Sequence, residues 1–200
     1  MAEDRVSPPP QPAPRCGWAN GDALMEAYHD AEWGVPTFDG HALFELVSLE
    51  GFQAGLSWRT ILHRREGFRL AFDGFDPAKI ASYDTEKVES LMQDEGIIRA
   101  RAKIKATVGN ARSYLRMMDA GEDFSTFIWG HVGGSPLMGD GANVPAQTEI
   151  SRALSKSLKD SGFKFVGGVT AYAFMQAAGL VNDHALDCGR RAACAAVSLS

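Results

Sequence analysis

Residues 154–176 read LSKSLKDSGFKFVGGVTAYAFMQ and carry two helical patterns in close succession. Leu154 and Leu158 recur at helical spacing, Gly162 ends that pattern, and a second helical pattern begins after Gly167. The stretch therefore predicts two helices joined by a short turn with glycine at both ends.

This turn has the chemistry to hold a phosphate group. The amides that open the second helix are unsatisfied donors at its positive dipole end, and glycine lets a ligand approach the backbone closely. Lys156, Lys159 and Lys164 lie beside the turn and favour a nucleic-acid backbone as the ligand. Any pair of helices joined by a tight turn gives a similar pattern, and a solvated charged face is the ordinary alternative.

Outward from this stretch the chain continues to read as helical. Asp39 is placed to cap a helix that carries Leu43, Leu46 and Val47 on one stripe. Further caps are expected at Ser57, at Asp76 followed by Pro77, and at Asp84. A long helix is expected from Ile97 to about Met118, and a loop-rich connection over 120–147. No segment alternates with period two for long, so the predicted fold class is all-α.

Length and composition allow one compact domain. The chain has 200 residues, of which 45% are hydrophobic and 22% charged. Residues 1–14 hold five of the nine prolines and are expected to be a disordered lead-in. We expect a single domain over 15–189 and a flexible tail over 190–200.

Targeting signals and cysteine usage favour a cytoplasmic protein. No apolar run approaches the ~20 residues that span a bilayer, and no secretory leader pattern opens the chain, so no membrane partner is expected. Three cysteines are too few and too odd in number for a disulfide scaffold. They suggest free thiols or metal ligands.

The net charge of −5 hides a patterned distribution. Residues 59–116 hold 12 basic and 8 acidic side chains, and residues 152–200 hold 6 and 3. An acidic chain with two basic blocks can still bind DNA if folding brings those blocks to one face.

Glu50 is the first candidate for chemistry. Its spacing from Leu43 and Leu46 puts a carboxylate on the stripe that should face the core. An ionised carboxylate buried without partners costs several kcal/mol, so Glu50 is either paired, at the helix end, or beside a cavity. Gln53 and Trp58 follow within a few residues, which makes a pocket for a flat ligand conceivable.

Cysteine and histidine occur in two pairs that could hold a metal. His184 and Cys188 stand at i and i+4, so one helical turn would place them on one face, whereas Cys16 and His29 have no regular local spacing. Spacing alone leaves satisfied histidines and buried cysteines as the alternative. The competing ligands are His41, His63, His131 and Cys194.

Four stretches together resemble one family closely, the 3-methyladenine DNA glycosylases of type I. They are RCGWANGDALMEAYHDAEWGVP (15–36), LFELVSLEGFQAGLSW (43–58), GIIRARAKIKATVGNARSYL (96–115) and the opening stretch extended to His184. The similarity covers roughly residues 15–188.

The resemblance implies an all-α helix-hairpin-helix fold and a base-flipping enzyme that removes 3-methyladenine from double-stranded alkylated DNA without cutting the strand. It also implies one structural zinc ion that joins the two ends of the chain, and we expect the enzyme to act as a monomer. The resemblance assigns zinc binding to Cys16, His29, His184 and Cys188. It assigns catalysis and base binding to Glu50, and stacking on the base to Tyr28, Trp58 and Trp18. The residues expected at the DNA are Gln53, Leu56, Gly162, Lys164 and Gly167.

Two departures from the family pattern and two rival functions accompany this interpretation. Met25 stands where relatives can have tyrosine, which could loosen one wall of the pocket, and the sequence after Cys188 matches nothing in the family pattern.

One rival function is that of a glycosylase that uses Asp183, 16 residues beyond Gly167, as its catalytic carboxylate. The other is a zinc-stapled helical module that binds DNA without cleaving it.

Overall fold

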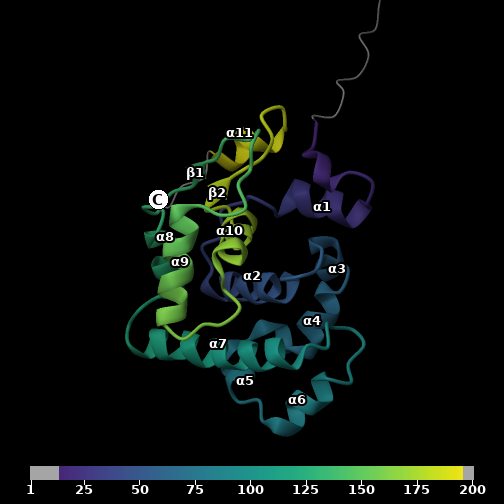
Figure 1. The fold of residues 1–200 in the computed structure, drawn as a ribbon, viewed down its shortest axis with the longest axis vertical. Coiled ribbons are helices and arrows are strands. Elements are labelled where there is room, and N and C mark those ends of the chain that lie inside the picture. Colours follow the sequence, from purple (N-terminus) through teal and green to yellow (C-terminus); the bar gives the residue numbers. More distant parts are fainter. Residues whose placement is uncertain (1–13, 196–200) are drawn as a thin grey trace, which may run out of the picture.

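The computed structural model describes residues 14–195 and is dominated by α-helices (Figure 1). The α-helices are α1 (Ala23–Ala31), α2 (Gly40–Gln53), α3 (Trp58–Leu62), α4 (Arg65–Ala71), α5 (Pro77–Ala81), α6 (Thr85–Leu91), α7 (Arg101–Asp119), α8 (Phe124–Gly130), α9 (Glu149–Asp160), α10 (Gly168–Ala177) and α11 (Arg190–Ala195). Two short 3-10 helices, η1 (Gly17–Ala19) and η2 (Asp73–Phe75), and two short strands, β1 (Leu137–Met138) and β2 (Val181–Asn182), complete the described chain. The predicted all-α class is confirmed.

The predicted helix caps are confirmed. The side chains of Asp39, Ser57, Asp76 and Asp84 each accept a hydrogen bond from a backbone N–H in the first turn of the helix that follows. Each cap satisfies a donor that has no partner within its helix, which stabilises the helix by about 1 kcal/mol. These caps set where the helices around the site begin.

The core lies among several helices. Helix α10 packs against both α9 and α2, and the long α7 runs below them in the view of Figure 1. Aromatic side chains fill the space between them, and Trp129, Phe44, Phe52 and Phe124 are fully buried. Burying each such side chain contributes roughly 1.5–3 kcal/mol. The helix that carries Glu50 is therefore held rigidly by the core.

Helix α7 begins four residues later than predicted, at Arg101 rather than Ile97. Gly96 packs backbone to backbone against Gly67, and Ile97 is buried in the core just after this contact. This contact holds residues 97–100 outside the helix. Helix α7 then runs to Asp119, close to the predicted end.

The C-terminal region differs from the prediction. Residues 190–195 were expected to belong to a flexible tail but form α11, in which Cys194 is buried. The Arg191 guanidinium donates to the carbonyl oxygens of Gly139 and His184 and so fastens this helix to the chain around β1 and β2. Side-chain bonds to distant carbonyls leave no periodic signal in the sequence. Residues 1–13 of the predicted lead-in and 196–200 of the predicted tail lie outside the described residues.

The parallel pairing of β1 with β2 was also not anticipated. Leu137 pairs with Val181 and Met138 with Asn182, so the loop-rich connection is held beside the chain that leads into His184. Two-residue strands are too short to be recognised by alternation. Among residues 14–195, no helix combines the length and apolar character needed to cross a membrane.

Candidate active site and metal cluster

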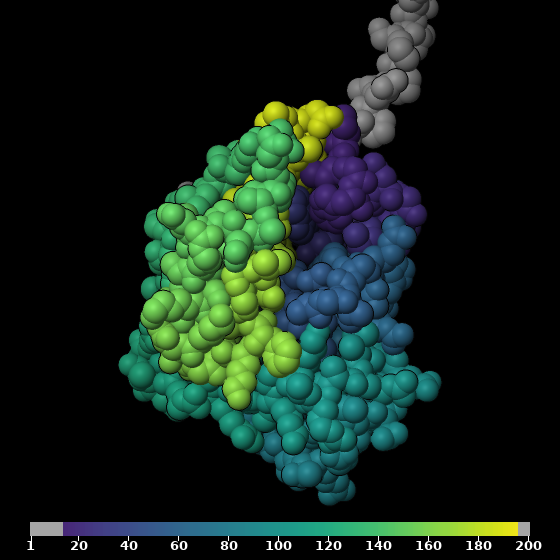
Figure 2. Space-filling view, in the orientation of Figure 1, coloured from purple at the N-terminus to yellow at the C-terminus, as the bar shows by residue number. Residues whose placement is uncertain are grey.

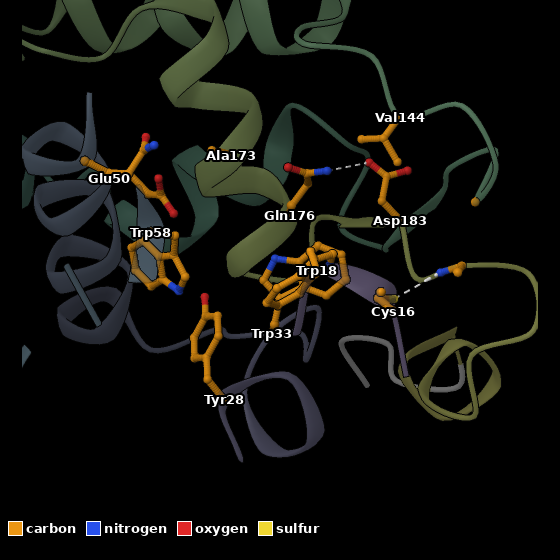
Figure 3. A pocket seen from close by; sticks show the side chains of 14 residues that line it. Cys16, Trp18, Tyr28, Trp33, Glu50, Trp58, Val144, Ala173, Gln176 and Asp183 are labelled. Atoms are coloured by element: carbon orange, nitrogen blue, oxygen red, sulfur yellow. Dashed lines mark hydrogen bonds between the residues drawn. The ribbon is translucent and has the colours of Figure 1, made fainter. Parts of the chain in front are cut away.

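A cavity of about 400 Å³ opens between the N-terminal and C-terminal parts of the fold. Figure 2 shows it as a hollow between the purple and blue segments and the green and yellow ones. Aromatic rings form much of its wall, as Figure 3 shows, and the carboxylate side chains of Glu50 and Asp183 line it as well. The aromatic residues are Trp18, Tyr28, Trp33 and Trp58. A pocket of this size with a few polar groups among aromatic side chains is typical of small-molecule sites.

Glu50 lies in the last turn of α2 and is only 4% exposed. Among the described residues its carboxylate has no ion-pair or hydrogen-bond partner, so the paired alternative is not found, and the carboxylate lies both at the helix end and beside the cavity. Burial raises the pKa of Glu50 to about 8. The stripe of Leu43 and Leu46 correctly predicted that the Glu50 carboxylate faces inward. The fold tolerates this buried carboxylate because it lines a cavity.

Two of the aromatic side chains in the cavity wall also carry hydrogen-bond donors. The rings of Tyr28 and Trp58 lie 5.3 Å apart, and those of Trp18 and Trp33 lie 5.0 Å apart. The Tyr28 hydroxyl and the Trp58 indole N–H are buried without a hydrogen-bond partner among residues 14–195. Buried polar groups normally have partners, so these two donors are suited to a ligand that would satisfy them.

Met25 does not line the cavity. It is buried in a small cluster with Tyr28 and Leu62, on which Trp58 also packs. The side chain therefore supports the stacking residues from behind, and the loosened wall suggested by this departure is not found.

The four predicted metal ligands come together at one end of the cavity. Their ligand atoms all lie within 4.8 Å of one another, and all four residues are buried. Cys16 Sγ lies 3.6 Å from His184 Nδ1, and Cys188 Sγ lies 3.5 Å from both His184 Nδ1 and His29 Nε2. A tetrahedral zinc ion with bonds of ~2.3 Å to sulfur and ~2.05 Å to nitrogen gives sulfur–nitrogen edges of about 3.6 Å. The residues present therefore fit a closed, four-coordinate zinc site.

The local structure around His184 and Cys188 differs from the prediction. The two residues do not lie on a helix but in the turn between β2 and α11, in which the Cys188 N–H donates to Ala185 O. The four-residue spacing nevertheless brings Cys188 Sγ within 3.5 Å of His184 Nδ1, because the turn folds the chain back between the two residues. Burial lowers the pKa of His184 to about 4, which keeps the ring neutral as a metal ligand requires.

Asp183 lies in the cavity wall rather than at the metal cluster. Its Oδ2 accepts hydrogen bonds from the Tyr172 hydroxyl at 2.6 Å and from Gln176 Nε2 at 2.9 Å (Figure 3). Its Oδ1 is buried and has no partner within the described part of the chain. Both partners belong to α10, and neither is a ligating histidine.

The hairpin between α9 and α10 is held in an unusual backbone shape. Gly162 and Phe165 have φ of 98° and 57°, and the second value is costly for a residue with a side chain. Asn110 on α7 is buried, and its side-chain amide exchanges two hydrogen bonds with the backbone of Lys164, at 2.8 and 3.1 Å. Gly167 has an ordinary φ of −61° and caps α10, with open space where a Cβ would be.

Gln53 is the last residue of α2, and Leu56 lies in the bend that follows it. The Gln53 side-chain amide donates to Leu56 O at 2.7 Å and so shapes the bend before Ser57. Leu56 is 40% exposed, so its apolar side chain is accessible at this bend. Gln53 also lines the cavity, so this bend forms part of its rim.

The chain matches the methyladenine glycosylase family model over residues 18–192. It is 53% identical over 177 residues to DNA-3-methyladenine glycosylase 1 of Escherichia coli (strain K12), covering 87% of this chain and 95% of the relative. The chain belongs to the methyladenine glycosylase family.

Solved structures of this family share the fold. A crystal structure of 3-methyladenine DNA glycosylase I superposes with a TM-score of 0.86 at 51% identity, covering 88% of this chain and 98% of that one. A 3-methyladenine DNA glycosylase I in complex with 3-methyladenine superposes with a TM-score of 0.84 at 35% identity, covering 92% and 99%.

The basic block 59–116 of this methyladenine glycosylase is only partly free of contacts within the protein. It stays a candidate for DNA binding together with the second basic block, but most of its charged groups have protein acceptors. Arg65 pairs with Glu32, Arg101 pairs with Glu89, and Arg112 donates to backbone carbonyls. The same holds for Arg59, Arg64, Arg69, Arg99, Lys103 and Arg116. Net charge per segment cannot reveal such pairing, which depends on the fold.

Sequence reasoning also missed residues that shape the site of this methyladenine glycosylase. Asn110 holds the hairpin, and Gln176 lines the cavity beside Asp183. The Lys103 ammonium donates to Phe52 O and Ala54 O at the end of α2. The only available signals were polar residues amid helical stripes, and such residues usually face solvent.

Proposed function

We propose that the protein is a DNA-3-methyladenine glycosylase, which hydrolyses the N-glycosidic bond of 3-methyladenine in alkylated double-stranded DNA. The observation that carries this proposal is the cavity that combines aromatic walls with the buried, unpartnered Glu50 carboxylate. Family membership adds support, since the similar E. coli protein is named for this activity and a related structure holds 3-methyladenine.

The charge of the substrate determines what the enzyme must do. Methylation at N3 gives the base a formal positive charge, so the glycosidic bond is already weak and the base leaves as a neutral molecule. No general acid is needed to protonate the leaving group. The protein must extrude the nucleotide from the helix and select the cationic base.

Glu50 provides the charge selection. With a pKa of about 8, it is mostly protonated in the free protein at neutral pH. A cationic base in the cavity favours the ionised form, so the proton is released as the lesion enters. The carboxylate then accepts hydrogen bonds from the adenine edge, and a charge-assisted bond of this kind contributes roughly 1.5–3 kcal/mol. The same charge would stabilise positive charge that develops on the sugar.

Aromatic stacking supplies the second part of the selection. Tyr28, Trp58 and Trp18 offer π-faces that attract a cation by about 0.5–2 kcal/mol. The unpartnered Tyr28 hydroxyl and Trp58 indole N–H are available to acceptor atoms of the base. Together with the Glu50 bond, these contacts are enough for about 100-fold selection or better.

DNA would be held by the α9–α10 hairpin, in the manner of a helix-hairpin-helix motif. The amides that open α10 would bind a phosphate together with Gly162, Lys164 and Gly167, because a helix N-terminus attracts anions. At the rim of the cavity, the exposed Leu56 would fill the gap left by the extruded base, with Gln53 beside it.

A zinc ion would be held by Cys16, His29, His184 and Cys188. Two thiolates and two neutral imidazoles make such a site neutral and closed, so the ion would supply structural cross-linking of the two chain ends and no reacting water. Cys16 also lines the cavity and lies two residues from Trp18, so the cluster would steady one wall of the base pocket.

A glycosylase that uses Asp183 is the second candidate, because the unpartnered Asp183 Oδ1 is buried in the wall of the same cavity. The two carboxylates can be separated by substitution. If Asp183 activates water, Asp183→Asn abolishes excision and leaves binding of the free base intact. If Glu50 is the functional carboxylate, Asp183→Asn keeps most of the excision rate.

Release of bases from methylated duplex DNA tests the proposed activity. We expect the full chain to release 3-methyladenine, detected by chromatography, and to leave the strand uncut. Because the matched pocket has no lysine, no covalent enzyme–DNA complex should be trapped by borohydride. DNA binding without base release would favour the zinc-stapled binding module and overturn the proposal.

We further propose that the catalytic domain begins at residue 15 and extends through α11, beyond the expected boundary at 189, and that the enzyme acts as a monomer in the cytoplasm. All groups invoked above belong to one chain. Sedimentation at concentrations around the DNA dissociation constant should give the mass of a monomer.

A further inference from the structure

The two histidines of the cluster present opposite nitrogens to the thiols. His29 faces Cys188 Sγ with Nε2, which also accepts the Cys16 N–H at 3.3 Å. An accepting nitrogen carries no proton, so in the neutral ring the proton lies on Nδ1. His184 faces Cys16 and Cys188 with Nδ1, and its Nε2 lies 3.1 Å from the Trp33 carbonyl. A carbonyl only accepts, so here the proton lies on Nε2.

The outward nitrogen of His29 meets a carboxylate. Asp30 Oδ1 lies 2.8 Å from His29 Nδ1. The Arg15 guanidinium grips the same carboxylate, with Arg15 Nε 2.9 Å from Oδ1 and 2.8 Å from Oδ2. Arg15 precedes the ligand Cys16 and Asp30 follows the ligand His29, so this ion pair ties both N-terminal ligands together from outside the cluster.

We propose that Asp30, held by Arg15, is a positioning residue of the metal cluster. It fixes the proton of His29 on Nδ1 and the orientation of the ring, so that Nε2 is ready to bind the ion. Partners of this kind on the far nitrogen of a ligating histidine are general contributors to metal affinity. The inference rests on the proposed zinc site and adds a residue that is not a ligand.

The same ring touches the base pocket. The His29 ring lies 5.5 Å from the Trp18 ring, edge to face, and is stacked with Trp33 at 6.2 Å. Tyr28, the other stacking candidate, is its neighbour in α1. A His29 ring that is fixed by Asp30 therefore also fixes the aromatic wall next to it.

Two other groups provide matched controls. Glu26 contacts the same Arg15 at 3.4 Å but touches neither imidazole. Cys194 Sγ lies 3.6 Å from His184 Nε2, where the Trp33 carbonyl already accepts the proton. Removing either group leaves both rings with their partners.

The test is zinc affinity, measured by competition with a chromophoric chelator on the full chain. Asp30→Ala should weaken zinc binding about 10- to 100-fold. Asp30→Asn keeps an acceptor oxygen but loses the charge, and should lose less. Glu26→Gln and Cys194→Ala should stay within about twofold of wild type. Nitrogen-15 spectra of the zinc-loaded wild type should show His29 protonated on Nδ1 and His184 on Nε2.

The outcomes separate this inference from the zinc proposal itself. If the wild type binds zinc stoichiometrically and Asp30→Ala binds it equally well, Asp30 has no positioning role. An equal loss in Glu26→Gln would also overturn the inference, because it would point to Arg15 and general surface charge. A wild type that binds no zinc would overturn both proposals.

Discussion

The base pocket and the metal cluster share the wall around Cys16, yet their polar groups differ in one respect. In the cluster, the thiols and imidazoles face one another, and the outward nitrogens bind Asp30 and the Trp33 carbonyl. In the pocket, the Glu50 carboxylate, the Tyr28 hydroxyl and the Trp58 indole N–H have no partners in the described chain. The difference favours the proposal that the cluster is a closed structural site and that the pocket is an open one that a ligand would complete.

Removing the metal should have the largest effect and should be an effect on stability. Cys188→Ser removes one thiolate and so opens the link between the two chain ends. We expect a loss of more than about 5 kcal/mol and a fall in melting temperature of more than about 10 °C. Calorimetry together with elemental analysis checks this. Full zinc content and unchanged melting in Cys188→Ser would mean that the cluster is not the metal site.

The metal is expected to stabilise the folded state, whereas an ionised Glu50 should destabilise it. Its folded pKa of about 8 lies above the ordinary value of 4.5, so the folded state keeps a proton that the unfolded state loses as pH rises. The free energy of unfolding of the wild type should therefore equal that of Glu50→Gln near pH 4. As pH rises from about 4.5 to 8, the wild type should lose stability relative to the variant. At pH 9 the wild type should be less stable by at most about 5 kcal/mol. Denaturant unfolding at both pH values measures this, and a destabilised Glu50→Gln at pH 9 would identify Glu50 as a structural carboxylate.

Trp58→Ala should weaken base binding and leave the cluster unchanged. The substitution removes stacking area, which for a nucleobase contributes about 1–3 kcal/mol. We expect affinity for free 3-methyladenine, and for the related base 3-deazaadenine, to fall about 10- to 100-fold in calorimetric titrations. The zinc content should stay at that of wild type. A loss of zinc in this variant would show that the two sites are not separable.

Lys164→Ala should give the smallest change. The residue lies on the hairpin, outside the lining of the pocket and outside the cluster, and its backbone is held by Asn110. Affinity should fall for any DNA sequence, and the slope of binding against salt should fall by about one unit. Fluorescence anisotropy with undamaged and methylated duplexes tests this. A loss confined to methylated DNA would contradict the hairpin assignment.

The sequence predicted those features that depend on local rules. Capping residues such as Asp39 and Ser57 marked helix starts, and the stripe before Glu50 predicted which way its side chain faces. The family resemblance supplied the ligand set of the cluster, for which spacing alone was insufficient because Cys16 and Cys188 lie far apart in the chain.

What could not be predicted depends on contacts between distant segments. The start of α7 is set by backbone contact between Gly96 and Gly67, and the order of the C-terminal segment is set by Arg191 bonds to carbonyls. The partners of Asp183 and of most arginines between 59 and 116 likewise come from other elements. Composition and periodicity carry no information about such pairings.

The most direct test of the account is the pH dependence of 3-methyladenine release from methylated duplex DNA by wild type and Glu50→Gln. The base in DNA is cationic at every pH, so kcat/KM should follow ionisation of Glu50 in the free enzyme. We predict a wild-type kcat/KM that rises about tenfold per pH unit from pH 6 and levels off near pH 8, and a low, flat profile for Glu50→Gln. A flat wild-type profile with full activity in Glu50→Gln would contradict the claim that this carboxylate selects the cationic base.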